Sequence, residues 1–84
     1  SKNDLNILDV RSQSENNSGS IEESLNIPLI DLKDKIQSID DNDKLYIHCK
    51  GGYRSMIACS ILNSRSIKNI ENIKGGFDKI SASL

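Results

Sequence analysis

The hydrophobic positions of this chain fall into short runs that are separated by polar segments. Four runs have the length and composition of β-strands, and they cover residues 5–10, 25–28, 45–48 and 70–73. The proline at position 28 should stop the second strand, because proline cannot donate to a sheet ladder. The run over residues 45–48 is expected to be the central strand.

Other apolar residues recur at helical spacing. From position 29 to position 39, leucine and isoleucine lie three or four residues apart, which predicts an amphipathic helix over 29–39. Residues 56–62 are apolar almost all round, which predicts a buried helix. The remaining segments are expected to be a loop or ragged helical turn at 12–20, turns at 40–44 and 75–76, and a final helical turn at 77–80.

Strands that alternate with helical connections predict an α/β fold, with a small parallel β-sheet flanked by helices. With 84 residues and no internal repeat or linker, the chain should form one domain over residues 1–84. It begins with Ser1 rather than Met, so we expect it to be a domain excised from a longer chain.

Residues with useful chemistry follow the ends of these strands. Asp9 and Arg11 lie at the end of the first, Pro28 ends the second, Cys49 follows the third, and Gly75 and Gly76 follow the fourth. In parallel sheets, ligands bind outside the carboxyl ends of the strands. The sequence therefore predicts a site along this edge.

Cys49 is the strongest candidate for a reactive group. The loop and helix start after it contain two glycines and two basic residues, and run Lys50, Gly51, Gly52, Tyr53, Arg54, Ser55. A cysteine between a strand and a helix N-terminus can lie inside a ring of backbone N–H groups, which stabilise an anion. We therefore expect the pKa of Cys49 to be lowered, since the thiolate is the nucleophilic form.

Composition and charge narrow the possible partners. A net charge of −1 gives no reason to expect nucleic acid or an anionic membrane as a partner, and no apolar run is long enough to span a bilayer. Two cysteines are too few for a disulfide scaffold, so we expect a cytoplasmic protein with reduced thiols. Cys49, Cys59 and His48 lack the spacing and the fourth ligand of a zinc site, so no metal or other cofactor is expected.

Four segments, in order along the chain, resemble motifs of the rhodanese superfamily of sulfurtransferases. Residues 8–11 are similar to its Asp-x-Arg strand end, and residues 15–28 to the segment that ends in Ile-Pro. Residues 49–54 match its Cys-x-x-Gly-x-Arg loop, and residues 72–77 resemble its Gly-Gly motif. The second segment departs from the family, with Ser20 in place of a frequent histidine and with different residues at 22–24.

The resemblance implies that Cys49 accepts a sulfane sulfur from thiosulfate or a persulfide and passes it to a thiol acceptor. For this family the chain is short at both ends, which implies a minimal version or a domain fused to another. Residues 48–58 resemble rhodanese domains attached to metallo-β-lactamase-like persulfide dioxygenases, and this implies such a fused domain as a partner.

The loop residues have predicted roles of their own. Gly51 and Gly52 should adopt backbone angles closed to other residues, so that the amides converge. Lys50 either attracts an anionic donor or is a solvated surface lysine. The Arg54 guanidinium holds loop carbonyls or an anion.

Residues near the loop are expected to be structural. Asp9 and Arg11 should point the same way and form a polar brace beneath the loop. His48 should be packed on the opposite face of the strand from Cys49, since adjacent strand residues alternate. Cys59 is expected in the core of the apolar helix, in preference to a role as a resolving thiol.

Two other functions compete with sulfur transfer. Cysteine-dependent phosphatases also place an arginine after the cysteine, but their loop has five intervening residues, and here there are four. A smaller ring suits one sulfur atom better than a phosphoryl group. A non-catalytic docking or regulatory module is the other alternative, although such modules commonly lack the cysteine.

Overall fold

The computed structural model describes residues 6–21, 24–40 and 42–73. Four strands form one sheet in the order β2-β1-β3-β4, and every neighbouring pair is parallel. The strands are β1 (Asn6–Asp9), β2 (Leu25–Asn26), β3 (Leu45–His48) and β4 (Ile70–Asn72). The predicted parallel sheet is confirmed, with β1 and β3 at its centre. β3 has the predicted bounds, and β1, β2 and β4 end one or two residues earlier than expected.

The segment after β1 was predicted to be a loop or a ragged helical turn, and the helical alternative is right. Helix α1 (Gln13–Ser18) begins with Ser12 as its N-cap. The Glu15 N–H donates to Ser12 Oγ at 3.2 Å, and the Ser12 N–H donates to Glu15 Oε1 at 3.0 Å. This reciprocal capping box satisfies two otherwise free donors, which is enough to start a helix in a polar segment.

The predicted amphipathic helix is present, but as the 3₁₀ helix η1 (Leu29–Ser38). Its backbone leaves helical angles at Lys35, with φ −119° and ψ 17°. The apolar spacing explains the type of helix: steps of three residues, from 29 to 32 and from 36 to 39, match three residues per turn. The one step of four residues spans the break at Lys35.

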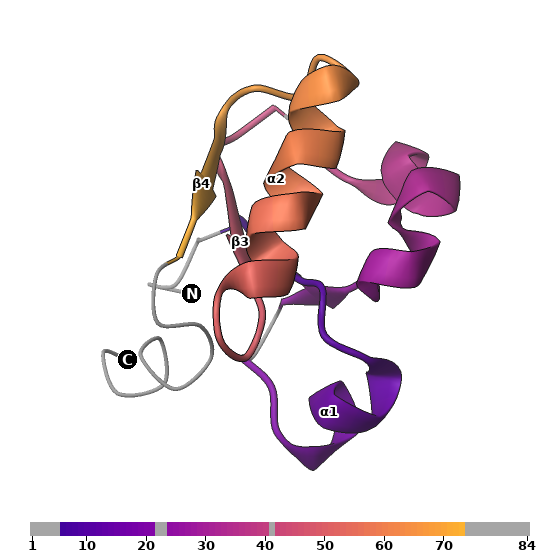
Figure 1. Ribbon diagram of the computed structural model, residues 1–84. Coiled ribbons are helices and arrows are strands. Elements are labelled where there is room, and N and C mark those ends of the chain that lie inside the picture. The colour runs from indigo at the N-terminus through magenta and orange to yellow at the C-terminus, as the bar shows by residue number, and fades with distance from the viewer. Residues whose placement is uncertain (1–5, 22–23, 41, 74–84) are drawn as a thin grey trace.

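Helix α2 (Tyr53–Ser64) follows β3 and packs on the sheet beside β3 and β4 (Figure 1). The helix was predicted from residue 56, and it was expected to be buried all round. Instead it buries one side, through Ser55, Ala58 and Leu62, while Tyr53 and Met56 are exposed. Among the described residues, no helix is both long and apolar enough to cross a bilayer.

The two faces of the sheet carry different clusters. The main core lies on the side of α2 and η1, and it includes Leu8, Ile47 and Cys49. Ile7 and Ile21 form a smaller cluster, with Tyr46 packed against it. Because side chains alternate along a strand, the sulfur of Cys49 lies on the side that α2 covers.

Helix α2 ends in a Schellman motif. The Ile67 N–H donates to the Leu62 carbonyl at 3.0 Å, and the Ser66 N–H donates to the Asn63 carbonyl at 3.1 Å. Ser66 has a φ of 71°, a left-handed conformation that this motif requires and that glycine adopts most readily. The side chain of Ser66 is exposed, so no packing interaction of this side chain offsets the cost of its positive φ.

Replacing this residue by glycine should therefore stabilise the domain. We expect Ser66→Gly to raise the free energy of unfolding by about 0.5–1 kcal/mol, because the steric cost of a positive φ is removed. Urea unfolding followed by circular dichroism measures the change. Ser64→Gly, inside the same helix, is the control and should destabilise it; a loss of stability with both variants would contradict the argument.

Candidate active site

Cys49 lies directly after β3 and is 1 % exposed. Its Sγ accepts hydrogen bonds from the Gly52 N–H at 3.0 Å and the Ser55 N–H at 3.3 Å. The Cys49 thiol donates to Ser55 Oγ at 3.5 Å. The predicted arrangement, with backbone N–H groups converging on the sulfur, is thus present in the folded chain.

The sulfur also serves as the cap of α2. The N-cap residue of this helix is Gly52, which has no side chain to accept a hydrogen bond from the first turn. Ser55 is the third residue of the helix, and its N–H is a donor that an N-cap side chain normally satisfies. Here the sulfur of Cys49 accepts it, so the positive end of the helix dipole is directed at the sulfur.

Two effects compete over the pKa of Cys49. Burial raises it, because a buried thiolate loses its hydration. Hydrogen bonds from the Ser55 side chain and from the backbone of Ser55, Gly52 and Arg54 lower it. The hydrogen bonds prevail, so the pKa lies below its ordinary value, in the direction expected from the sequence.

The two loop glycines differ in what the backbone requires. Gly52 has φ 95° and ψ −10°, in the left-handed region that favours glycine. Gly51 does not have a positive φ, and a Cβ built on it would meet nothing within 4 Å. The predicted need for special backbone angles is therefore right for Gly52 and wrong for Gly51.

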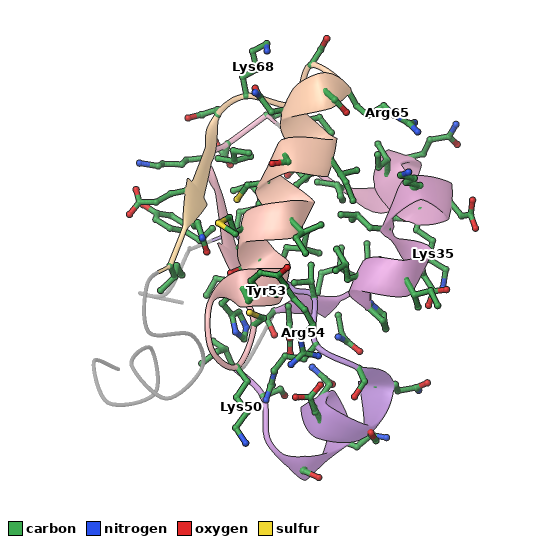
Figure 2. All side chains as sticks on the ribbon, in the orientation of Figure 1. Lys35, Lys50, Tyr53, Arg54, Arg65 and Lys68 are labelled. Atoms are coloured by element: carbon green, nitrogen blue, oxygen red, sulfur yellow. The ribbon has the colours of Figure 1, made fainter. Side chains whose placement is uncertain are left out.

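Lys50 and Tyr53 lie on the exposed side of the loop (Figure 2). Lys50 points away from α2, and Tyr53, the first residue of α2, is 70 % exposed. Within the part of the chain that the structure describes, neither side chain forms a hydrogen bond or an ion pair. The attraction of an anionic donor by Lys50 stays a prediction.

Arg54 forms a two-pronged ion pair with Glu15. Arg54 Nη1 donates to Glu15 Oε1 at 2.7 Å, and Nη2 donates to Oε2 at 2.9 Å. The anion held by this guanidinium is thus a carboxylate from α1. The pair lowers the pKa of Glu15 to about 2, and it raises the pKa of Arg54, to which the nearby charge of Cys49 also contributes.

The predicted brace of Asp9 and Arg11 is present, and its hydrogen bonds hold α1. Arg11 Nε and Nη2 donate to the Asp9 carboxylate at 2.9–3.1 Å, and Arg11 Nη2 also donates to the Gly19 carbonyl at 2.7 Å. Asn16 Nδ2 donates to Asp9 Oδ2 at 3.0 Å. Because Asn16 inside α1 and Gly19 at its C-terminal end are tied to Asp9 and Arg11, Glu15 is held in position for Arg54.

His48 is fully buried on the face of β3 opposite to Cys49, as predicted. Its Nε2 lies 4.0 Å from Asp9 Oδ1. Burial lowers the pKa of His48, Asp9 raises it and Arg11 lowers it, with a net lowering that favours the neutral ring. Its position suits packing beneath the sheet end better than proton transfer at the sulfur.

Cys59 is half-buried and packs against the core from α2, so the expectation of a core residue is right in part. It also lines an open groove of about 390 Å³ between α2 and β4. Burial raises the pKa of Cys59, which keeps this thiol protonated and less reactive than Cys49.

Three of the four predicted site segments meet at one edge of the sheet. The Ile27 N–H donates to the Asp9 carbonyl, and the Leu29 N–H after Pro28 donates to the Val10 carbonyl. The Val10 N–H in turn donates to the His48 carbonyl, beside Cys49. Gly75 and Gly76, and the helical turn predicted at 77–80, lie outside the described residues.

A sequence profile of the family described as "Rhodanese-like domain" matches residues 1–83. The chain belongs to the rhodanese-like domain family. Among its curated relatives, the putative sulfurtransferase YtwF of Bacillus subtilis is 30 % identical over 73 residues, which cover 87 % of this chain and 70 % of YtwF. The resemblance seen in the four motifs is thereby confirmed.

The likeness extends to structure. A rhodanese-like domain protein from Staphylococcus aureus has 32 % identity and a TM-score of 0.82, over 88 % of this chain and 72 % of that one. The uncharacterized protein YqhL of Bacillus subtilis is 36 % identical over 73 residues, and this rhodanese-like domain matches 58 % of YqhL's length. Membership of this family, with a relative named as a putative sulfurtransferase, supports sulfur transfer as the general chemistry.

The sequence does not predict two hydrogen-bond partners of the loop residues in this rhodanese-like site. Glu15 begins a matched motif, yet nothing local shows that it pairs with Arg54; the Ser-x-x-Glu spacing predicts only its capping role. Asn72 Oδ1 accepts a hydrogen bond from Ser55 Oγ at 2.5 Å. That contact depends on how β4 lies against β3, which no short motif encodes.

The two glycines offer a matched pair of substitutions. Gly52→Ala should lower the free energy of unfolding by about 1 kcal/mol or more, because alanine is strained at φ 95°. Gly51→Ala should change it by less than about 0.5 kcal/mol, since neither backbone nor space opposes a methyl group. Equal losses in urea unfolding would show that the conformation of Gly52 is not the constraint.

The pair of Glu15 and Arg54 predicts a stability difference that depends on pH. The pKa of Glu15 is lowered on folding, from 4.5 to about 2, so its contribution is present above pH 4.5 and is lost as the pH falls towards 2. Near pH 6, Glu15→Gln should destabilise the domain by about 1 kcal/mol, a value reduced for partial exposure.

The measurement is urea unfolding of wild type and Glu15→Gln between pH 6 and pH 3. The gap between the two proteins should narrow as the pH falls. Glu71→Gln is the control, because Glu71 pairs with Lys44 at 2.7 Å with both side chains about half exposed, and it should change stability little. A gap for Glu15→Gln that stays constant down to pH 3 would contradict the assigned pKa.

Proposed function

We propose that this domain is a rhodanese-type sulfurtransferase that moves sulfane sulfur from thiosulfate or a persulfide to a thiol acceptor through a persulfide on Cys49. The observation that carries the proposal is the convergence of the Gly52 and Ser55 N–H groups on Cys49 Sγ, at 3.0 and 3.3 Å. Donors at that distance stabilise negative charge on the sulfur without rearrangement. The relative named as a putative sulfurtransferase supports the same chemistry.

The first transfer forms one S–S bond and breaks another. The Cys49 thiolate attacks the sulfane sulfur of the donor, and the S–S bond of the donor breaks. Its electron pair leaves with sulfite when the donor is thiosulfate, or with a thiolate when it is a persulfide. Cys49 is then a persulfide, whose outer sulfur carries the negative charge.

In the second transfer the acceptor thiolate attacks that outer sulfur, and Cys49 leaves as a thiolate. The S–S bond that forms in the acceptor persulfide replaces the S–S bond that breaks at Cys49, so no external oxidant or reductant is needed. A thiol of lowered pKa serves both halves, because it is ionised for the attack and is a good leaving group afterwards. No cofactor is required by either step.

The burial of Cys49 bears on the choice of substrate. At 1 % exposure, the sulfur is reached most easily by a donor that presents a terminal sulfur on a narrow stem. Thiosulfate and small persulfides have that shape. Lys50, at the exposed side of the loop, is available to attract an anionic donor before the transfer.

A cysteine-dependent phosphatase is less well supported. Phosphoryl transfer needs a guanidinium that faces the transferred group, and both prongs of Arg54 are engaged by Glu15. The loop between Cys49 and Arg54 is also one residue shorter than phosphatases use. A docking module would not require the lowered pKa of Cys49.

The persulfide itself is the decisive test. After incubation with thiosulfate or a small persulfide, intact-mass spectrometry should show one added sulfur atom on the wild type and none on Cys49→Ser, whose hydroxyl stays protonated. Cys59→Ser is the matched control, because its thiol has a raised pKa, and it should gain the sulfur atom. The transfer of sulfur to cyanide should be lost in Cys49→Ser and kept in Cys59→Ser.

The same preparations separate the alternatives. Absence of added sulfur on a folded wild-type domain, with every donor, would support the docking module. Efficient hydrolysis of an aryl phosphate by the wild type, without sulfur transfer, would place the phosphatase first. A sulfur atom retained on Cys49→Ser would show that another residue is the carrier.

A further inference from the structure

The hydroxyl of Ser55 has one proton and three neighbouring acceptors. Ser55 Oγ lies 3.0 Å from the Gly52 carbonyl, 2.5 Å from Asn72 Oδ1 and 3.5 Å from Cys49 Sγ. Ser55 is fully buried, so no bulk water adds a donor there. The direction of this one proton therefore depends on what its neighbours offer.

The protonation state of Cys49 decides which neighbour the Ser55 hydroxyl proton is directed to. While Cys49 is a thiol, its S–H donates to Ser55 Oγ, and the Ser55 proton is free to go to Asn72 Oδ1. Once the sulfur is an anion, it donates nothing and attracts a further donor. Hydrogen bonds to an ion are roughly twice as strong as neutral ones, so the Ser55 proton should then turn to the sulfur.

Asn72 is suited to both arrangements because its side chain carries an acceptor and a donor on one terminal group. In the thiol state its Oδ1 accepts from Ser55. A half-turn of the amide would present Nδ2 instead, which would donate to Ser55 Oγ and replace the bond lost from the thiol. A residue that could only accept would keep the Ser55 proton away from the sulfur.

The hydrogen bond between Ser55 and Asn72 connects helix α2 to strand β4. Asn72 is the last residue of β4, and it is paired in register with Ile47 of β3, two residues before Cys49. Ser55 belongs to α2, so the contact joins the edge strand to the first turn of the helix. Among the described residues no hydrogen bond joins Asn72 to the sulfur, and the contact between them runs through Ser55.

We propose that Asn72 is a positioning residue that turns the Ser55 hydroxyl toward Cys49 when the sulfur is an anion. In this arrangement Asn72 accepts the Ser55 proton in the thiol state and donates an amide N–H to Ser55 Oγ in the thiolate and persulfide states. The inference rests on the proposed function for its persulfide half, whereas its thiolate half stands on geometry alone.

The charged groups already present near the sulfur are kept in every variant that tests this inference, and only Asn72→Asp adds a charge. Arg54 of α2 is paired with Glu15 of α1, and Asp9 of β1 is paired with Arg11. His48 adjoins Cys49 along β3 and lies beside Asp9, and Lys50 is exposed on the loop. None of these groups contacts Asn72 in the described hydrogen bonds and ion pairs, so changes at Asn72 leave them in place.

The test measures the apparent pKa of Cys49 from the pH dependence of alkylation by iodoacetamide, with Cys59→Ala as the background. Asn72→Ala should raise the pKa by about half a unit, equivalent to roughly threefold less thiolate below the pKa. Ser55→Ala should raise it as well. Adding Asn72→Ala to Ser55→Ala should cause no further rise, because the residue through which Asn72 acts is gone.

Asn72→Asp is a further test of the donor half. Aspartate keeps the acceptor and the shape but cannot donate, and its negative charge also disfavours a thiolate nearby, so the pKa should rise further than in Asn72→Ala. A wild-type pKa in Asn72→Asp would overturn the donor role. No rise in Asn72→Ala, or the same rise with and without Ser55, would overturn the proposal as a whole.

Asn63→Ala is the matched control, because Asn63 lines the same groove between α2 and β4 and is exposed, with its amide oxygen bonded to Lys68. It should leave the pKa of Cys49 unchanged. Thermal unfolding of each variant verifies that the fold is kept. Alkylation needs no sulfur transfer, so a coupled shift in pKa without persulfide formation would uphold this inference while the proposed function fails.

Discussion

The first turn of α2 has no side-chain cap, and the sulfur of Cys49 takes that place. This interaction joins the central strand to the helix, since Gly52 contributes the turn and Ser55 the donor. The same hydrogen bonds stabilise the start of the helix and favour a negative charge on the sulfur. A sulfur that satisfies helix N–H groups is held in the positive end of the helix dipole, where a negative charge is favoured over its cost of burial. The left-handed conformation of Gly52 makes this geometry possible.

The surrounding structure keeps α1 and the loop in a fixed relation. Asp9 and Arg11 anchor α1 at Asn16 and Gly19, and α1 then places its carboxylate against the guanidinium that follows the loop. Arg54 is paired with Glu15, and its positive charge still interacts with the charge of Cys49, which contributes to the raised pKa of Arg54. The two hydrogen bonds to Glu15 fix the orientation of the Arg54 guanidinium relative to the loop.

The parts of this structure that the sequence predicted are those set by local patterns. Alternation along β3 placed Cys49 and His48 on opposite faces, and the strand–cysteine–glycine–helix order located the ring of donors. The type of η1 was not predictable, because the apolar pattern mixes steps of three and four residues, and only the structure shows that the step of four falls at the break at Lys35. The bond from Arg54 to Glu15 joins residues 39 apart in the chain, and the bond from Ser55 to Asn72 depends on strand register. Such contacts are decided by tertiary structure.

The donors around the sulfur differ in how far they can respond to its charge. Backbone N–H groups of Gly52 and Ser55 are fixed by the turn and the helix, so their positions do not change with the charge on the sulfur. The Ser55 hydroxyl rotates about a single bond, and its proton can follow the charge. In the proposed catalytic cycle the sulfur alternates between a thiolate and a longer persulfide, whose charge lies one bond further out. Fixed amides best stabilise the first position, and a hydroxyl whose orientation can change is better able to serve both. The pairing of rigid donors with one adjustable donor is consistent with a site that must hold two anions of different reach.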